Sequence, residues 1–312
     1  MSQRVSYFNG QFVPEREARL SIYDAGLLMG DIAFEVTRTI RHEPFRLDAH
    51  IKRLFHSLGE LRIDPQITPT ALHTATLETV ARNLSTEAAD IDWNIIHNVS
   101  RGPSRAFSEA FEPSEFRPTV IISCYPLTDK VAALAPEYES GVNLVVPAQR
   151  SLPHNLLDSS IKSRSRLHYQ LANLQADAMQ RGSTAALVDP EGFLTEGSSG
   201  NLFVVRGGRL ETPLPRNLLP GVTRHLVLEL AERLGVPARE TDITIAEAEQ
   251  ADEMFLTSTT IGILHARSLN GHTFGTGKIG PITRRLQEAL YDLVGLDFEA
   301  QSREYASRIG KR

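Results

Sequence analysis

One lysine and one glutamate constrain this chain more than any other feature. Lys162 lies in the segment SIKSRSRLHY (residues 160–169), after an apolar run and before a predicted helix. Glu196 ends a predicted strand in the segment LTEGSSGNL (residues 194–202). If the two side chains act together, the fold must bring them to one site.

The chain has only five lysines, and their settings differ. Lys52 falls on an amphipathic helix whose apolar positions direct it outward. Lys130 lies in a stretch with Pro and Asp, Lys278 in a Gly-rich loop, and Lys311 at the C-terminal end. Only Lys162 follows an apolar run and leads into a helix. A solvated surface lysine is the usual role of this residue type, but it does not account for this setting.

The two residue types suit one cofactor. A lysine amine can hold an aldehyde as a Schiff base, and a carboxylate can keep a pyridine nitrogen protonated so that the ring accepts electrons. Both roles belong to pyridoxal phosphate (PLP).

Three further features indicate a phosphate site. Gly221-Val222-Thr223 precedes an apolar helix, where backbone N–H groups and a hydroxyl form a small anion cradle. The run Thr257–Thr260 places hydroxyls at a strand end, and Arg53 offers a fixed positive charge. Each feature alone is commonly a helix cap, a strand end or a surface arginine. Together with Lys162 and Glu196 they indicate PLP.

Composition excludes several classes. With 312 residues, 41% hydrophobic and 23% charged, the chain is of ordinary globular type and long enough for two domains. A net charge of −5 indicates no nucleic-acid partner. No apolar run is long enough to span a membrane, and no secretory leader is evident. The single cysteine, Cys124, favours a cytoplasmic protein, and the scattered histidines predict no metal site.

Periodicity predicts a mixed fold of the α+β (mixed α/β) class. Residues 5–13 read as a hairpin around Asn9-Gly10. Further strands are predicted at 34–40, 93–100, 118–125, 142–147, 185–188, 202–205, 238–241 and 253–257. Helices are predicted at about 48–61 with Asp48 as N-cap, and at 69–84, 166–181, 222–234 and 282–294. A small α/β domain over residues 1–125, a linker over 126–140 and a larger domain over 141–312 follow from this order.

These residues resemble the class IV (fold type IV) PLP aminotransferases. That family includes branched-chain and D-amino-acid aminotransferases, (R)-selective amine aminotransferases and aminodeoxychorismate lyase. The resemblance covers almost the whole chain, and its blocks follow the family order. They are FRLDAHIKRL (45–54), the Lys162 block, EGSSGN (196–201), GVTR (221–224) and ADEMF (251–255). The resemblance implies a small N-terminal domain, a larger pseudo-barrel C-terminal domain that binds PLP, and a homodimer.

The resemblance also assigns roles to individual residues. Lys162 is expected to carry PLP and to move the proton between the substrate α-carbon and the cofactor C4′. Glu196 is expected to face the pyridine nitrogen. The positions that match the phosphate site are Arg53, Val222, Thr223 and Thr260.

Substrate residues follow the subfamily patterns less closely. Arg38 matches the branched-chain pattern, but Val36 replaces its glycine and Ile95 or a neighbour its strand arginine. Arg105 matches the D-amino-acid pattern, whose histidine and tyrosine are replaced by Phe107 and Phe34. Four residues after the lysine fit none of the subfamilies, namely Arg164, Arg166, His168 and Tyr169.

The sequence therefore predicts an aminotransferase that moves the amino group of an L-branched-chain or similar apolar amino acid to a 2-oxo acid. Phe34, Arg38 and Arg105 are the predicted substrate residues. A D-amino-acid or (R)-amine aminotransferase and an aminodeoxychorismate-type lyase stay open as alternatives. A catalytically silent PLP-binding protein is the alternative from a different class.

Overall fold

The computed structural model describes residues 4–310, so Lys311 lies outside the described residues. The chain divides into two compact units. The N-terminal unit comprises Met1–Thr128 and Ile161–Ser165, and the C-terminal unit comprises Asp129–Ser160 and Arg166–Arg312. The segment that carries Lys162 thus belongs to the N-terminal unit. Residues 126–140, predicted as a linker, contain the last residue of a strand and the helices α4 (Thr128–Ala132) and α5 (Ala135–Ser140).

The N-terminal unit is built on a six-stranded sheet in the order β2-β1-β6-β5-β3-β4. All neighbouring strands are antiparallel. The strands are β1 (Val5–Phe8), β2 (Gln11–Pro14), β3 (Ile32–Ile40), β4 (Glu43–Pro44), β5 (Trp93–Ser100) and β6 (Thr119–Pro126). The predicted hairpin is confirmed, because Asn9 (φ 48°) and Gly10 (φ 93°) join β1 to β2 with the positive φ values of a tight turn.

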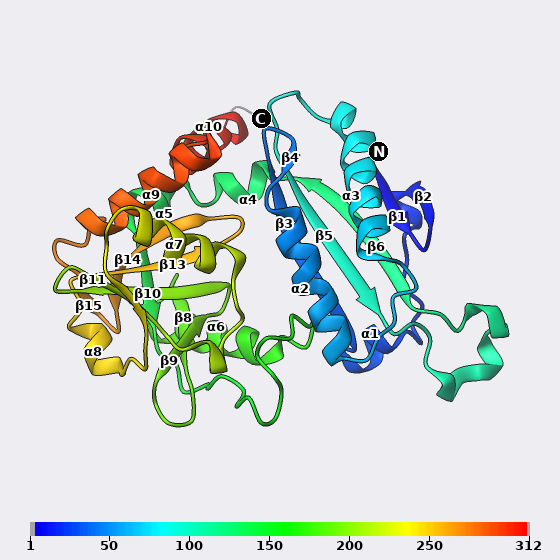
Figure 1. Ribbon diagram of the computed structural model, residues 1–312, viewed down its shortest axis with the longest axis horizontal. Coiled ribbons are helices and arrows are strands. Elements are labelled where there is room, and N and C mark those ends of the chain that lie inside the picture. Colours follow the sequence, from blue (N-terminus) through cyan, green and yellow to red (C-terminus); the bar gives the residue numbers. More distant parts are fainter. Residues whose placement is uncertain (1–3, 311–312) are drawn as a thin grey trace. The chain divides into compact units, whose positions relative to one another are not determined.

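Two long helices cover one face of this sheet (Figure 1). Helix α2 (Leu47–Glu60) lies along β3, and α3 (Pro69–Asn83) lies along β1 and β6. Their apolar sides pack against Trp93, Ile95 and Ile122 in a buried core. The prediction of Asp48 as N-cap is wrong. Helix α2 already begins at Leu47, and its N-cap Arg46 has left-handed backbone angles and no side-chain cap.

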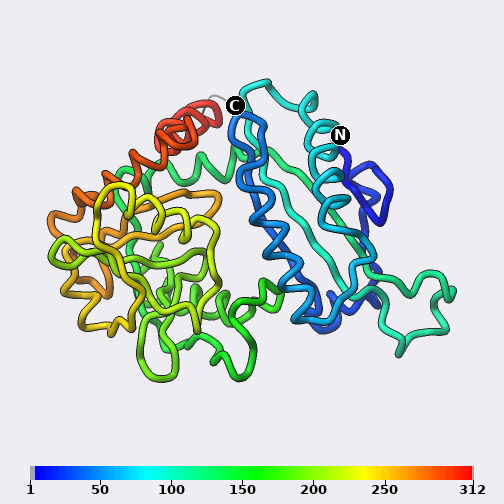
Figure 2. Tube along the Cα trace, viewed as in Figure 1, coloured from blue at the N-terminus to red at the C-terminus, as the bar shows by residue number. Residues whose placement is uncertain are grey.

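Shorter helical segments complete the N-terminal unit. Helix α1 (Ala25–Met29) is capped by Asp24, whose carboxylate accepts from the N–H of Gly26. The 3₁₀ turns are η1 (Glu15–Glu17), η2 (Leu84–Thr86), η3 (Arg105–Ala110) and η4 (Pro113–Glu115). Turns η3 and η4 lie in the segment between β5 and β6, which extends away from the sheet as a long teal loop (Figure 2).

The C-terminal unit contains a nine-stranded sheet that closes on itself. Its order is β12-β11-β10-β13-β14-β7-β8-β9, β15 pairs with β14, and a further pairing joins β9 to β10. The ring from β10 through β13, β14, β7, β8 and β9 back to β10 is the predicted pseudo-barrel. The strands are β7 (Val142–Val145), β8 (Thr184–Val188), β9 (Leu194–Gly197), β10 (Gly200–Arg206), β11 (Arg209–Thr212), β12 (Ala238–Glu240), β13 (Glu253–Ser258), β14 (Gly262–Leu269) and β15 (His272–Thr273).

The remaining helices belong to this unit. They are α6 (Leu167–Met179), α7 (Val222–Arg233), α8 (Ile245–Glu249), α9 (Pro281–Val294) and α10 (Phe298–Ile309), with one 3₁₀ turn, η5 (Pro215–Asn217). Helix α6 buries Ala172 and Ala176, whereas its leucines lie at its surface, with Leu167 71% exposed. Among the described residues, no helix is long and apolar enough to cross a membrane.

Candidate functional site

The segment Ile161–Ser165 runs antiparallel beside β3 in the N-terminal unit. The N–H of Phe34 donates to the carbonyl of Lys162 (2.9 Å), and the N–H of Arg164 donates to that of Ile32 (3.0 Å). Between these two bonds, Ala33 pairs with Ser163. The N–H of Lys162 also donates to Ser57 Oγ on α2 (3.0 Å). A strand and a helix of the N-terminal unit therefore fix the backbone of Lys162.

Alternation along this segment sets the direction of its side chains. In extended chain, residues two apart share a face, so Lys162 and Arg164 lie on one face and Ser163 on the other. Phe34 is opposite Lys162 in the ladder and shares that face. The Lys162 amine lies 4.8 Å from the centroid of the Phe34 ring. The structure thus brings a predicted substrate residue to the predicted cofactor lysine.

Arg53, a predicted phosphate residue, is held by a buried carboxylate. Glu35 accepts from Arg53 Nε (2.6 Å) and Nη2 (2.9 Å), and it lies 2.8 Å from His50 Nδ1. Burial alone would raise the pKa of Glu35, but the Arg53 charge and the hydrogen bonds from Arg53 and His50 hold that pKa well below its usual range. Burial lowers the pKa of His50, although the hydrogen bond to Glu35 and the charge of Glu35 act to raise it. An ionised Glu35 thus fixes the orientation of the Arg53 guanidinium.

Glu196 lies in the C-terminal unit, where neutral groups donate to it. The Tyr169 hydroxyl donates to Oε1 (2.5 Å), and the Leu219 N–H donates to Oε2 (3.2 Å). The amide of Asn201 lies 3.4 Å from Oε2 and also donates to the Leu219 carbonyl (2.9 Å). Burial and the nearby Glu196 charge raise the pKa of Tyr169 well above its usual value, so its hydroxyl stays a donor. The carboxylate is therefore held in one orientation.

Tyr169 contacts Glu196, and the sequence did not predict this contact. Its ring lies under the Arg166 guanidinium (4.1 Å to the centroid), and Arg166 Nη2 donates to the Ser198 carbonyl (2.7 Å). The signal in the sequence was that both residues match no subfamily pattern. The contact to Glu196 joins residues 27 positions apart, so no local pattern could predict it.

The predicted phosphate residues of this unit lie near Glu196. Val222 and Thr223 begin α7, whose N-cap Gly221 makes no side-chain cap. A Cβ on Gly221 would meet Asn201 Oδ1 at 2.0 Å, so any larger residue here would displace the Asn201 side chain. The same Asn201 contacts Glu196, which makes the start of α7 a neighbour of that carboxylate.

The run of hydroxyls lies across the ladder from Asn201. Thr257 pairs with Asn201 between β13 and β10, and its Oγ1 is buried with no hydrogen-bond partner among the described residues. Thr260 is buried in the tight turn between β13 and β14. A fixed carboxylate, an open helix N-terminus and an unsatisfied buried hydroxyl in one unit fit the ring and phosphate of PLP.

The two predicted carboxylate clamps lie elsewhere in the N-terminal unit. Arg38 is fully buried, with Nη2 at 3.7 Å from Asp92 Oδ2 and Nε donating to the Thr39 carbonyl (3.1 Å). It is four residues from Phe34, or roughly 13 Å along the strand. Arg105 lies in the exposed turn η3, with its guanidinium 5.2 Å from the centroid of the Phe116 ring. The geometry therefore places neither arginine on the Lys162–Phe34 pair.

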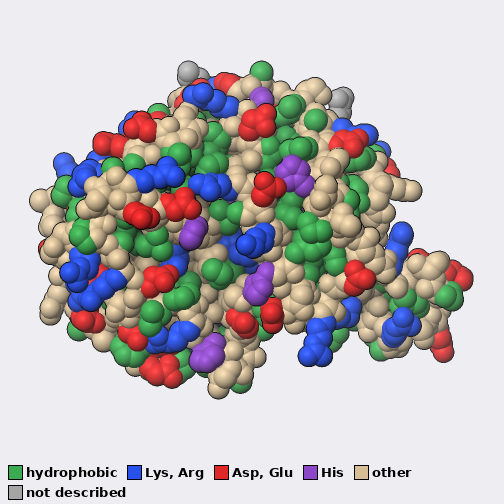
Figure 3. All heavy atoms as spheres, in the orientation of Figure 1, with side chains coloured by type: hydrophobic (Ala, Val, Ile, Leu, Met, Phe, Trp, Pro, Cys, Tyr) green, Lys and Arg blue, Asp and Glu red, His purple; other side chains and the backbone are tan. Residues whose placement is uncertain are grey.

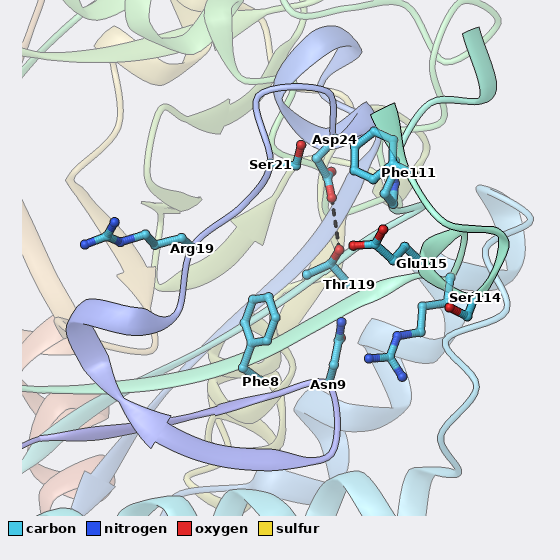
Figure 4. Close-up of a pocket in the computed structure, with 11 residues that line it drawn as sticks. Phe8, Asn9, Arg19, Ser21, Asp24, Phe111, Ser114, Glu115 and Thr119 are labelled. Carbon is cyan, nitrogen blue, oxygen red and sulfur yellow. Dashed lines mark hydrogen bonds between the residues drawn. The ribbon is translucent and has the colours of Figure 1, made fainter. Parts of the chain in front are cut away.

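A separate pocket of the N-terminal unit contains none of the predicted site residues (Figure 4). Of its two carboxylates, Asp24 accepts from the hydroxyls of Thr119 (3.0 Å) and Ser100 (2.9 Å) and from the N–H of Gly26 (2.7 Å). These bonds fix the start of α1, so Asp24 has a structural role.

Two further expectations concern metals and the thiol. Residues 4–310 contain no group of three or more His, Cys, Asp and Glu side chains that could hold a metal ion. Burial raises the pKa of Cys124 to about 12, as expected of an inert core thiol.

On the face shown in Figure 3, acidic and basic side chains are interspersed.

Comparison with known sequences gives a consistent result. The pattern of the family described as "Amino-transferase class IV" matches residues 32–269. A putative branched-chain-amino-acid aminotransferase of Methanocaldococcus jannaschii is 32% identical over 289 residues, which cover 92% of this chain and 95% of the relative. A D-alanine aminotransferase of Bacillus licheniformis is 30% identical over 288 residues, with 92% and 96% coverage.

Solved structures lead to the same family. The branched-chain amino acid aminotransferase of Escherichia coli superposes with a TM-score of 0.83 at 26% identity, covering 94% of this chain and 95% of that one. A branched-chain aminotransferase of Thermoproteus uzoniensis with norvaline gives a TM-score of 0.82 at 26% identity, with 97% and 98% coverage.

Proposed function

This chain belongs to the class IV aminotransferases, and from that premise we propose that it transfers the amino group of an apolar L-amino acid to a 2-oxo acid with PLP. The observation that carries the proposal is the pair of prepared positions. One is Lys162, with its backbone tied to β3 and α2, and the other is Glu196, with three donors directed at it. Relatives of both sequence and fold are branched-chain aminotransferases.

We assign each residue one task toward the cofactor. Lys162 would hold the aldehyde carbon, Glu196 would face the pyridine nitrogen, and Val222, Thr223, Thr260 and Arg53 would hold the phosphate. When bound, PLP supplies an electron sink for the bonds at the substrate α-carbon.

The chain's own residues then move and hold protons. The Lys162 amine would take the proton from the substrate α-carbon and return it at the cofactor C4′. Tyr169 keeps its own proton and donates it in a hydrogen bond to Glu196, so that the carboxylate stays ionised and oriented. Glu35 holds the Arg53 guanidinium, whose charge suits a phosphate.

The substrate class is proposed from the relatives and from Phe34. An aromatic ring beside Lys162 gives an apolar wall, which favours aliphatic or aromatic side chains. A D-amino-acid aminotransferase is the second candidate, because a D-alanine aminotransferase is 30% identical over nearly the whole chain. The sequence predicted Arg38 and Arg105 as the carboxylate clamps of these two alternatives.

Half-reactions with single amino donors test the proposal. We expect L-leucine to convert the absorbance of bound PLP to that of the pyridoxamine form, with D-alanine much slower. Fast reaction with D-alanine and none with L-leucine would reverse the stereochemical assignment. A silent PLP-binding protein would show no change with any donor, and a lyase would require its own substrate. Lys162→Ala should abolish the change, whereas Lys52→Ala, on the exposed side of α2, should leave it intact.

We further propose a homodimer in the cytoplasm. The N-terminal unit exposes several large apolar side chains, with Ile22 67%, Leu27 63% and Met29 66% exposed, which a second copy would bury. Light scattering at micromolar concentration should give about twice 34.6 kDa. An active, strictly monomeric protein would contradict the dimer. The free, buried Cys124 agrees with a reducing compartment.

A further inference from the structure

Arg164 is the arginine that the strand register places beside Lys162. The pairing of Ala33 with Ser163 sets Lys162 opposite Phe34 and Arg164 opposite Ile32, all on one face of the sheet. The next strand continues the row, because Phe34 pairs with Asn98 of β5. The row through Lys162, Phe34 and Asn98 therefore crosses three neighbouring segments.

The Arg164 side chain leaves its own row and crosses to that of Lys162. Its guanidinium carbon lies 3.8 Å from the centroid of the Phe34 ring, and its Nε donates to Asn98 Oδ1 (2.9 Å). Stacking on the ring and the bond to Asn98 fix both the plane and the direction of the guanidinium. An arginine held in this way is already ordered before a ligand binds.

The spacing suits recognition of an amino acid. The Lys162 amine and the Arg164 guanidinium lie 4.8 and 3.8 Å from the same ring centroid. In an amino acid the carboxylate carbon lies about 2.5 Å from the amino nitrogen, and its oxygens accept from a guanidinium at about 2.8 Å. Both cationic groups contact the same ring, so they lie within about 9 Å of each other, a span that the amino group and carboxylate of one substrate can bridge.

The charge of Arg164 extends over the same face of the sheet. Burial raises the pKa of Tyr125, and the Asn94 hydrogen bond and the Arg164 charge act against this rise. Asn94 donates to the Tyr125 hydroxyl (2.6 Å), and its own buried Oδ1 has no hydrogen-bond partner among residues 4–310. Asn94 lies opposite Arg38 and Tyr125 lies opposite Asn94, so these polar groups line the face of the sheet that also carries Phe34.

We propose that Arg164 binds the α-carboxylate of the amino-acid substrate, in place of the predicted clamps Arg38 and Arg105. The inference rests on the proposed aminotransferase function and assigns the specificity residue of that reaction. Arg164 would select amino acids over amines that lack the carboxylate, and Asn98 would act as its positioning residue.

The test compares a substrate with its carboxylate-free analogue in the holoenzyme. We expect Arg164→Gln to lower kcat/KM for the preferred amino acid by about 100-fold, and to leave kcat/KM for 3-methylbutylamine within about threefold of wild type. Arg164→Lys should have a kcat/KM for the amino acid between those of wild type and Arg164→Gln, because a point charge replaces a planar fork. Asn98→Ala should also lower kcat/KM for the amino acid, by less than Arg164→Gln does. Arg82→Gln is the matched control. Arg82 of α3 also stacks on a phenylalanine, with its guanidinium carbon 4.1 Å from the centroid of the Phe12 ring.

Binding of 4-methylvalerate gives a second measurement that needs no turnover. Calorimetry should show a Kd about 10- to 100-fold weaker in Arg164→Gln at unchanged cofactor content, and an unchanged Kd in Arg82→Gln. An unchanged amino-acid preference and an unchanged Kd in Arg164→Gln would overturn the inference. If Arg38→Ala or Arg105→Ala alone loses the amino-acid preference and the 4-methylvalerate affinity, that arginine is the clamp instead. If the wild-type protein reacts with no amino acid of either hand, the proposed function itself fails.

Discussion

Each unit of this protein buries one carboxylate of interest, and the two are stabilised differently. Glu35 of the N-terminal unit is fully buried and accepts two hydrogen bonds from the Arg53 guanidinium, with His50 beside it. Glu196 of the C-terminal unit is 6% exposed, and a hydroxyl, an amide and a backbone N–H are directed at it. Glu35 is thus paired with the Arg53 cation, whereas a hydroxyl, an amide and a backbone N–H orient Glu196.

This difference separates a structural from a chemical task. A carboxylate paired with an arginine inside a protein mainly fixes that arginine and stabilises the fold. A carboxylate oriented by neutral donors keeps a charge that can act on a cationic ring nitrogen. Replacing each glutamate should therefore produce a different defect.

The largest expected effect is on stability, in Glu35→Gln. Loss of the charge removes the carboxylate that pairs with the largely covered Arg53 guanidinium, which should lower the free energy of unfolding by about 3–5 kcal/mol. Urea unfolding of the cofactor-free protein measures this. Glu60→Gln, at the exposed end of α2, serves as control. A loss no larger than that of the control would mean that Glu35 is not the partner on which Arg53 depends.

Glu196→Gln should act on catalysis rather than on the fold. We expect kcat to fall by about 10²–10³-fold, because a charge that stabilises the transition state is removed. Cofactor content and the urea midpoint should stay near those of wild type. Near-normal turnover in this variant would argue that Glu196 does not tune the ring.

A smaller effect concerns acid stability and His97, which pairs with Glu35 across β3 and β5. Burial lowers the pKa of His97 to about 4, while an unfolded histidine titrates near 6.5. The unfolded state thus binds more protons between these values, so stability falls as the pH drops through this window. From pH 7 to pH 5 we expect His97 to contribute about 2 kcal/mol to that loss. His97→Gln should flatten the dependence, and an equally steep curve would exclude His97 as its source.

Tyr169→Phe should have the smallest effect. It removes one hydrogen bond to the Glu196 carboxylate and keeps the ring under Arg166, so kcat should fall by about tenfold. The expected loss is well below that of Glu196→Gln. A double variant with Glu196→Gln should lose little beyond Glu196→Gln alone, because both changes affect one hydrogen bond. Fully additive losses would mean that Tyr169 acts elsewhere.

Local patterns predicted much of the fold. The Asn9-Gly10 turn and strand β5 over Trp93–Ser100 were found where the sequence placed them, because turn chemistry and β-branched runs act over a few residues. Strand β14 and helix α10 were missed. The glycine at position 262 begins β14 one residue after a run of hydroxyls, and α10 is polar over most of its length. Neither segment carries a clear apolar period.

The site was harder to predict than the fold. Lys162 and Glu196 stand out by residue type and position, but their contacts come from distant parts of the chain. The bond from Lys162 to Ser57 spans 105 residues, and that from Arg53 to Glu35 crosses from a helix to a strand. Helix α6 also buries Ala172 and Ala176 rather than its leucines, so its packing does not follow from its larger apolar residues.

Borohydride reduction of the holoenzyme followed by peptide mapping tests the central claim most directly. If Lys162 holds PLP as a Schiff base, reduction will fix the cofactor mass on the peptide that contains Lys162, and Lys162→Ala will carry none. Fixed cofactor on Lys52, Lys130, Lys278 or Lys311, or none on the wild-type protein, would contradict the assignment.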